Sequence, residues 1–408
     1  MCPLLIKRHH MIIQPKVRGF ICTTAHPLGC ARNVEEQVEY VRSKGPITGG
    51  PKKVLVLGAS NGYGLASRVT AAFGCNAATM GVFFERPAEP GKRTATAGWY
   101  NSTAFDAAAR KVGLYSKSFN GDAFSDEVRK QVCDAIAKNL GQVDCVIYSL
   151  ASPRRTEPKT GILYKSVLKP KGKPYTNKSI DFEKNQVTTV TLESATEQEI
   201  HDTIKVMGGE DWELWIEALR ARKLLAPKAV TIAYSYIGPD VTTPVYRNGT
   251  IGAAKDHLEA TAHKLDALLK KDGGRALVSV NKALVTQSSS AIPFIPLYFV
   301  LLMKVMKEKD VHENCIQQIY RLFAQRMYNG RPFGEVPVDE AGRVRIDDLE
   351  MRADVQAKVG KLWEIVSDGN VNQIADVKGY NDDFMHLFGF NFQGVDYNAD
   401  VTPDIPLA

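Results

Sequence analysis

Val54-Leu-Val-Leu-Gly-Ala-Ser-Asn-Gly-Tyr-Gly64 is the stretch of sequence that decides the fold. Its first four residues are apolar and predict a buried strand, and residues 65–73 predict a helix. Glycines at positions 58, 62 and 64 separate the two: the first allows a tight turn, and the others let phosphate and sheet approach the backbone. The N-terminus of the helix offers free N–H groups and a positive dipole to a pyrophosphate. The stretch therefore predicts a dinucleotide site, with an ordinary strand-to-helix turn as the alternative.

Five further apolar runs predict strands, and helical patterns lie between most of them. The runs are residues 78–84, 114–119, 143–148, 229–234 and 276–280. Strands that alternate with helices form parallel sheets covered on both faces. We therefore expect an α/β fold of Rossmann type, with a doubly wound parallel sheet and helices on both faces.

Two segments are additional to the elements of a minimal nucleotide-binding domain. Residues 156–199 are rich in Lys, Thr and Pro and include a small β excursion at 187–192, and residues 288–390 contain a largely helical pattern over 311–390. Ligands of open α/β sheets bind outside the carboxyl ends of the strands, so we expect both insertions to form the substrate region of a single domain over residues 11–408. Residues 1–10 lack the core of a signal peptide and are expected to be a disordered tail or a start-site extension.

The composition is that of a soluble globular enzyme. Apolar residues make up 44% and charged residues 24% of the 408 residues, which argues against disorder. The formal charge of +7 fits acidic partners such as a phosphate-bearing cofactor or an acidic carrier protein, and fits equally a simple contribution to solubility. No basic block is interleaved with aromatic residues, so a nucleic-acid-binding function is not expected.

The cysteines and the longest apolar run exclude other classes. Seven scattered cysteines without a C-x-x-C pair suit a cytoplasmic protein and argue against a zinc site or a disulfide framework, so no metal is expected. Residues 291–303 are apolar but contain Pro293 and Pro296, and 13 residues are too few to span about 30 Å of hydrocarbon. A buried helix or the wall of an apolar pocket is expected there.

Glu85 bears on the choice of cofactor. It ends the second predicted strand, about twenty residues after the glycine turn. A carboxylate at this position accepts hydrogen bonds from the ribose hydroxyls and repels a 2′-phosphate, which predicts NADH over NADPH. The adjacent Arg86 is the counter-evidence, because an arginine accommodates that phosphate. A solvated surface pair is the alternative interpretation.

Tyr246 and Lys255 are the candidate catalytic pair. Gly249, Thr250 and Gly252 predict a bend and a helix start between them, with Lys255 in the first turns. A tyrosine with a pKa near 10 is a weak acid at neutral pH, and a nearby ammonium favours its phenolate. Such a tyrosine stabilises or protonates an enolate. The spacing alone is weak evidence, because a packed aromatic residue and a solvated lysine would have the same separation.

Tyr234 and Tyr236 end the fifth predicted strand and face the same side of it. Catalytic groups gather at the carboxyl ends of such strands. One of the two is expected in the core and the other as a hydrogen-bond donor to a substrate carbonyl, with aromatic packing as the alternative for both.

Five longer motifs resemble one family. They are IQPKVRGFICTTAHP at residues 13–27, AGWYN at 97–101, NGDAF at 120–124, KVMGGEDWELW at 205–215 and AYSYIGP at 233–239. Together with the eight residues between Tyr246 and Lys255, they resemble the FabV-type enoyl-[acyl-carrier-protein] reductases, which are similar to the trans-2-enoyl-CoA reductases. These enzymes form a divergent branch of the short-chain dehydrogenase/reductases. The resemblance covers the chain from about residue 11 to its end.

The resemblance implies roles for individual residues. Tyr246 matches the proton donor, Lys255 a catalytic lysine that contacts the cofactor, and Tyr236 a substrate-binding tyrosine. The matched cofactor contacts are Gly58, Ala59, Ser60, Asn61, Gly62, Tyr63, Phe84, Glu85, Asp122, Ala123, Leu150, Ala151, Leu284, Val285 and Thr286.

The implied reaction is the NADH-dependent reduction of the carbon–carbon double bond of a trans-2-enoyl thioester, the last reductive step of fatty acid elongation. The substrate carrier is expected to be acyl carrier protein or CoA, and the protein a cytoplasmic monomer without integral membrane association. Two alternatives stay open: a short-chain ketoreductase acting on a carbonyl, and a non-catalytic NAD-binding protein.

Overall fold

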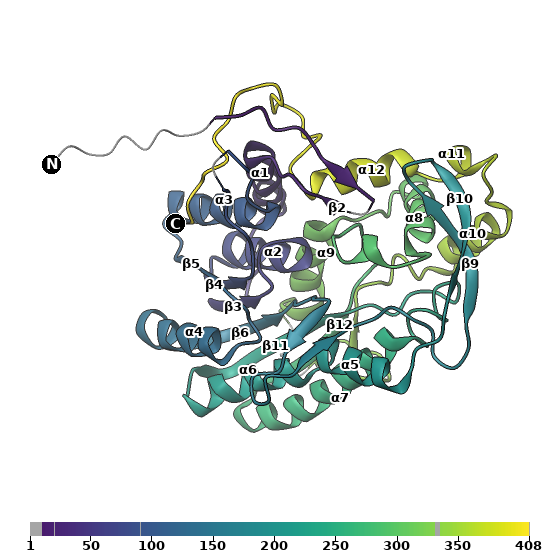
Figure 1. Ribbon diagram of the computed structural model, residues 1–408. Helices are drawn as coiled ribbons and strands as arrows, with labels where there is room; N and C mark the ends of the chain where they lie inside the picture. Colours follow the sequence, from purple (N-terminus) through teal and green to yellow (C-terminus); the bar gives the residue numbers. More distant parts are fainter. Residues whose placement is uncertain (1–9, 20, 90, 331–334, 408) are drawn as a thin grey trace.

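A parallel seven-stranded sheet forms the centre of the computed structural model, which describes residues 10–19, 21–89, 91–330 and 335–407 (Figure 1). The strand order is β13-β12-β11-β6-β3-β4-β5, and each neighbouring pair is parallel. The strands are β3 (Lys53–Leu57), β4 (Ala78–Phe83), β5 (Ser116–Asn120), β6 (Val143–Tyr148), β11 (Leu225–Ser235), β12 (Arg275–Val280) and β13 (Arg343–Arg345). The expected Rossmann-type architecture is confirmed. The expectation for residues 1–9 lies outside the described residues.

The strand order reverses between β3 and β6. The chain runs outward from β3 through β4 to β5, then returns to β6 on the other side of β3 and continues to β11, β12 and β13. A crevice forms where the connections after two neighbouring parallel strands run towards opposite edges of the sheet. Ligands bind in such crevices, beyond the carboxyl ends of the strands. The glycine turn follows β3 directly and therefore lies at this crevice.

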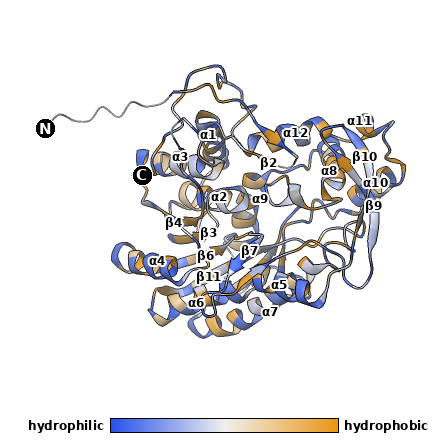
Figure 2. Ribbon diagram, in the orientation of Figure 1, coloured by the Kyte–Doolittle hydropathy of each residue, from blue (hydrophilic) through white to orange (hydrophobic). Residues whose placement is uncertain are grey.

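Helices cover both faces of the sheet through alternate strand residues. Val54 and Val56 face the layer of α1 (Pro27–Lys44), α2 (Gly62–Val69) and α3 (Ala97–Lys111). Leu55 and Leu57 face the layer of α4 (Asp126–Asn139), α6 (Glu210–Ala221) and α7 (Thr250–Leu269). These outer helices alternate hydrophobic and hydrophilic residues along their length, as α4 does in Figure 2. Burial of their apolar sides against the strands is the main favourable contribution to folding.

A third cluster lies beside the carboxyl ends of the strands. It is centred on α8 (Ile295–Glu308), which packs against α10 (Ala353–Ile365) and α12 (Val377–His386). The antiparallel hairpin of β9 (Tyr175–Asp181) and β10 (Gln186–Leu192) lies alongside (Figure 1). Lys178 Nζ donates to the carbonyls of Trp363, Glu364 and Val366 at the end of α10, which fixes the hairpin against this cluster.

The remaining elements are short or peripheral. Thr196 and Glu199 form a reciprocal capping box at the start of α5, which explains the position of that helix. The remaining α-helices and strands are β1 (Val17–Arg18), β2 (Ile21–Cys22), β7 (Arg154–Thr156), β8 (Leu163–Lys165), α5 (Glu197–Met207), α9 (Cys315–Arg321) and α11 (Val371–Ile374). Two π-helical turns, Thr70–Gly74 and Leu322–Met327, extend α2 and α9.

The six predicted strands are confirmed, and the sequence missed the seventh. β13 has three residues, Arg-Val-Arg, which is too short a run to show an alternating pattern. The apolar run at 291–303 forms most of α8, and among the described helices none is both long and apolar enough to cross a membrane. Five of the six described cysteines are buried, and all six are free thiols.

Candidate active site

The glycine turn lies tightly against the end of β6. Gly58 has a φ of 87°, and a Cβ atom there would lie 2.2 Å from the carbonyl oxygen of Ser149. A Cβ atom on Gly64 would lie 1.9 Å from the carbonyl oxygen of Gly58, so α2 starts directly over the turn. Asn61 precedes α2 without a side-chain capping bond, which leaves N–H groups of the first turn for an anionic ligand. The turn therefore fits a pyrophosphate.

Glu85 lies beside this turn. Ser60 Oγ donates to Glu85 Oε1 at 2.7 Å. Burial raises the pKa of Glu85, and the hydrogen bonds from Thr96 and Ser60 oppose that rise. A Cβ atom on Gly98 would lie 2.0 Å from Glu85 Oε1, so a larger residue there would displace the carboxylate. The geometry suits a ribose with free hydroxyls and disfavours a 2′-phosphate.

A cavity of about 840 Å³ runs from this turn to α8. Its cofactor end is lined from the strands on either side of the crevice, by Gly58, Ser60, Asn61, Gly62, Tyr63, Phe84, Glu85, Asp122, Ala123, Leu150 and Ala151. Leu284 and Thr286 line it from the segment after β12. Ala59 and Val285 are buried in hydrophobic clusters instead, and the cavity lining does not include their side chains. Thirteen of the fifteen residues named for cofactor contacts thus lie on one surface.

Tyr246 and Lys255 line the same cavity. Tyr246 precedes α7 and is 8% exposed, and Lys255 lies in the second turn of that helix. Lys255 Nζ donates to the backbone carbonyl of Tyr234 at 3.1 Å. Burial lowers the pKa of Lys255 to about 8, so at neutral pH most molecules carry the ammonium.

The prediction that an ammonium lowers the pKa of Tyr246 is wrong for this structure. Burial raises the pKa of Tyr246, because a phenolate there would be poorly solvated. Lys255 is directed to the carbonyl of Tyr234 and does not offset this effect. Tyr246 therefore keeps its proton at neutral pH and is a hydrogen-bond donor.

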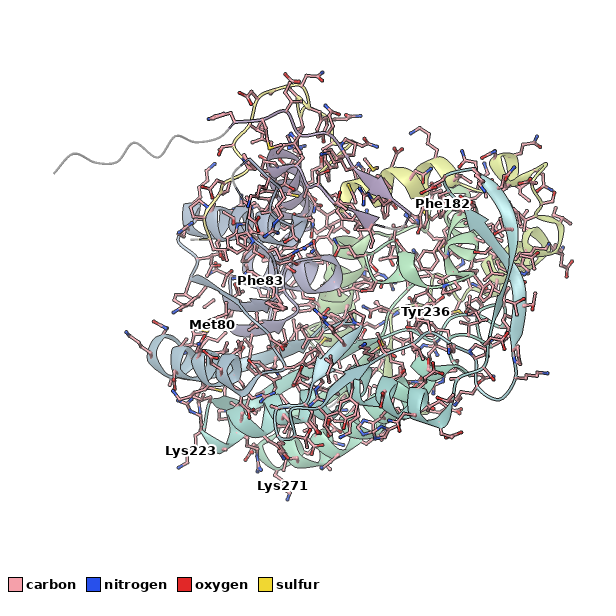
Figure 3. The ribbon with its side chains drawn as sticks, viewed as in Figure 1. Met80, Phe83, Phe182, Lys223, Tyr236 and Lys271 are labelled. Carbon is pink, nitrogen blue, oxygen red and sulfur yellow. The ribbon has the colours of Figure 1, made fainter. Side chains whose placement is uncertain are left out.

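Tyr234 and Tyr236 have different surroundings, one in the core and one next to Tyr246, as the sequence suggested. The Tyr234 hydroxyl is 2.6 Å from Ser67 Oγ, and its ring lies 5.8 Å from that of Tyr63, so it belongs mainly to the core. Tyr236 follows β11 and meets Tyr246 edge-on, with 4.9 Å between ring centroids. Figure 3 shows Tyr236 towards the middle of the view, whereas Lys223 and Lys271 lie at the lower rim of the molecule.

The far end of the cavity is apolar. Ile292, Ile295 and Phe299 line it from the start of α8 and the segment before it, and Leu387 from the end of α12. The neighbouring Leu297 and Val300 are buried in the core instead. The apolar run at 291–303 therefore supplies both a cavity wall and core packing, the two alternatives that the sequence left open.

Sequence reasoning missed two buried charged residues beside Tyr236. Glu350 Oε1 accepts from the Tyr236 hydroxyl at 3.0 Å, and Lys282 lines the cavity directly after β12. A lysine two residues after the buried strand 276–280 was a signal that the sequence contained. Glu350 gave none, because it lies in a turn more than a hundred residues from Tyr236.

Comparison with known proteins agrees with this geometry. The family model described as the trans-2-enoyl-CoA reductase catalytic region matches residues 93–328, and the NAD(P)H-binding domain of trans-2-enoyl-CoA reductase matches residues 12–90. The chain belongs to the trans-2-enoyl-CoA reductase family. This confirms the resemblance that the sequence motifs indicated.

Individual relatives are similar over nearly the whole chain. An enoyl-[acyl-carrier-protein] reductase [NADH] of Opitutus terrae is 63% identical, covering 97% of this chain and 100% of that protein. The trans-2-enoyl-CoA reductase structure of Treponema denticola in complex with NAD has a TM-score of 0.92 and 51% identity, covering 98% and 100% of the two chains. That of Clostridium acetobutulicum in complex with NADH has a TM-score of 0.92 and 45% identity, covering 96% and 98%.

A third family model, described as an enoyl reductase FAD binding domain, matches residues 338–401. This segment contains one connection from a sheet strand to a helix, between β13 and α10, and that connection has no glycine. It carries instead Asp347 and Asp348, whose carboxylates hold Arg345, Arg321 and Arg326 in ion pairs, so these arginines are not free for a pyrophosphate. The residues present do not fit a flavin dinucleotide in this trans-2-enoyl-CoA reductase family member, whereas the turn after β3 fits NAD.

Proposed function

We propose that this protein reduces the carbon–carbon double bond of trans-2-enoyl thioesters with NADH. The observation that carries the proposal is a single cavity lined by the glycine turn, Glu85, Lys255, Tyr246 and Tyr236. A dinucleotide seated on the turn would extend along the ends of the strands towards the two tyrosines. The relatives named above for NADH and for enoyl thioesters support the same activity.

NADH supplies the hydride when it is bound. Tyr246, protonated at neutral pH, and Tyr236 would donate hydrogen bonds to the thioester oxygen, where negative charge develops as the β-carbon takes the hydride. The α-carbon would then take up a proton, with Tyr246 as the donor that the family resemblance implies. The Lys255 ammonium would hold the ribose hydroxyls of the nicotinamide half, and Glu85 those of the adenosine half. Ile292, Ile295 and Phe299 would contact the acyl chain and exclude water from the reacting atoms.

The carrier and the setting of the reaction belong to the same proposal. The thioester carrier is acyl carrier protein or CoA, and residues 11–408 act as one reductase domain whose insertions, about 156–199 and 288–390, shape the substrate end. The protein works as a cytoplasmic monomer. Light scattering of the purified chain tests its oligomeric state.

A steady-state assay of NADH oxidation tests the activity. Crotonyl-CoA and enoyl-carrier-protein substrates of several lengths should be reduced, and acetoacetyl-CoA should not. NADH oxidation with acetoacetyl-CoA alone would favour a ketoreductase, and no oxidation with any thioester would favour a protein that only binds NAD. The ratio of kcat/KM values for the two carriers identifies the preferred one.

A further inference from the structure

Glu350 is a buried carboxyl that three donors share. It lies in the turn between β13 and α10 and is 0% exposed. The Tyr236 and Tyr298 hydroxyls donate to Oε1 at 3.0 and 2.7 Å, and the Ala283 N–H donates to Oε2 at 2.6 Å. Gln356 Nε2 donates to the Glu350 backbone carbonyl at 2.7 Å and fixes the turn. The carboxyl therefore connects the substrate tyrosine to the segment after β12.

Charged and titratable groups face Glu350 from several elements. Lys282 approaches from the end of β12 and Asp347 from its own turn, and Tyr236, Tyr298 and Tyr63 approach from β11, α8 and α2. Burial raises the pKa of Glu350, Asp347 raises it further, and the Lys282 ammonium and the hydrogen bonds from Ala283 and Tyr298 lower it. The net direction is upward, so the neutral acid persists to higher pH than for an exposed glutamate.

The two protonation states of Glu350 leave Tyr236 with different hydrogen bonds. A carboxylate has no proton to give, so both tyrosines donate to it, and the single Tyr236 proton is not available to a ligand. The neutral acid still accepts from Ala283 through Oε2, and its own O–H on Oε1 donates to the Tyr236 oxygen. The Tyr236 proton is then directed into the cavity that this residue lines.

We propose that Glu350 is a positioning residue whose neutral acid form turns the Tyr236 hydroxyl proton towards the thioester oxygen, and whose ionised form withholds it. The inference rests on the proposed function, because it names what orients one of the two donors to that oxygen. It involves no electron transfer and no proton transfer to the substrate from Glu350. Turnover should therefore fall as the pH rises and Glu350 ionises.

Glu350→Gln tests this directly. The glutamine carbonyl accepts from Ala283, and its NH₂ group donates to the Tyr236 oxygen, which reproduces at every pH what the neutral acid offers Tyr236. We expect wild-type kcat, measured with saturating NADH and crotonyl-CoA, to fall about tenfold per pH unit above the Glu350 pKa. E350Q should keep its low-pH kcat through that range. The proposal would be overturned if kcat of E350Q fell at alkaline pH as kcat of the wild type does. It would also be overturned if the low-pH kcat of E350Q were as small as that of Tyr236→Phe.

Substitutions at two residues next to Glu350 should shift the alkaline fall of kcat in opposite directions along the pH axis. Tyr298→Phe removes a hydrogen bond that lowers the pKa of Glu350, so the fall should move to higher pH. Asp347→Asn removes a negative charge that raises that pKa, so the fall should move to lower pH. A merely structural Glu350 would leave the fall in place in both variants, and that result contradicts the proposal. Circular dichroism establishes that each variant is folded.

Infrared spectroscopy gives a readout that does not depend on turnover. The difference spectrum of wild type minus E350Q should contain the carbonyl band of a protonated carboxyl group, and this band should disappear over the pH range in which kcat falls. Absence of the band at every pH refutes the inference. Absence of NADH oxidation by the wild type with any enoyl thioester would instead refute the proposed function, and the band would still report on Glu350.

Discussion

The two ends of the cavity are built in different ways. The cofactor end consists of turns that directly follow β3, β4, β5 and β6, and its central motif spans Gly58 to Gly64. The substrate end brings together Tyr236, Tyr246, the start of α8 and Glu350, which are distant from one another in the sequence. A local motif specifies the first end, whereas long-range packing specifies the second. Substitutions at the two ends should therefore affect binding and turnover differently.

The largest effect is expected for Tyr246→Phe at the substrate end. Loss of one donor to a developing oxyanion lowers kcat by about 10²–10³-fold, and the affinity for NADH should stay close to that of wild type. Stopped-flow kinetics with crotonyl-CoA and NADH fluorescence titration measure the two quantities. Tyr320→Phe is the matched control, because the Tyr320 hydroxyl donates to the carbonyls of Lys44 and Gly45. The turnover of this variant should be normal. Equal kcat values for the two variants would remove Tyr246 from the site.

Gly64→Ala perturbs the cofactor end. The new Cβ atom would lie 1.9 Å from the carbonyl oxygen of Gly58, so the turn must shift. We expect the free energy of unfolding to fall by about 1–3 kcal/mol and NADH binding to weaken. Gly360→Ala in α10 is the control, since no atom lies within 4 Å of its Cβ position, and it should be neutral or slightly stabilising. Chemical denaturation compares the two, and equal stabilities would contradict the tight turn.

Glu85→Gln should change the cofactor preference by about tenfold in favour of NADPH, which corresponds to roughly 1.4 kcal/mol. The substitution removes the negative charge that would face a 2′-phosphate. Ratios of kcat/KM for NADH and NADPH measure the change. Glu89→Gln is the control, because Glu89 is exposed and pairs with Arg93. An NADPH preference that does not improve in the Glu85 variant would refute the assignment.

The smallest effect concerns pH and the cofactor. Burial lowers the pKa of Lys255 to about 8, and ribose hydroxyls bind its ammonium form. Cofactor binding therefore favours the protonated lysine, and NADH affinity should decrease as the pH rises through about 8. Calorimetric titration at several pH values measures this dependence. Lys255→Met should bind NADH more weakly with a flatter pH profile, and a wild-type affinity constant from pH 6 to 9 would contradict the role.

The local character of the cofactor end explains why the sequence predicted it well. A strand, three glycines and a helix lie within about twenty residues, and Glu85 follows at the end of the next strand. The exceptions, Ala59 and Val285, follow the right strands but point into the core. Side-chain direction at a strand end depends on packing that a local motif does not contain.

The substrate end was predictable in part: residue patterns indicated the apolar wall at 291–303 and the strand end at Tyr236, whereas the family resemblance supplied the roles of Tyr246 and Lys255. The spacing of Tyr246 and Lys255 gave weak evidence by itself, and the expected acidification of Tyr246 failed because burial raises its pKa while Lys255 donates to the carbonyl of Tyr234. Glu350 meets Tyr236 only after β11, α8 and the turn after β13 have packed together. No periodicity or local spacing encodes such a contact.

A crystal structure of the protein with NAD and crotonyl-CoA tests most directly whether the two ends meet at one reaction point. The account predicts the thioester oxygen within about 2.6–3.2 Å of the Tyr246 and Tyr236 hydroxyls. It also predicts the β-carbon facing the nicotinamide ring above the turn after β3. A thioester bound away from both tyrosines, or a nicotinamide outside the cavity, would contradict it.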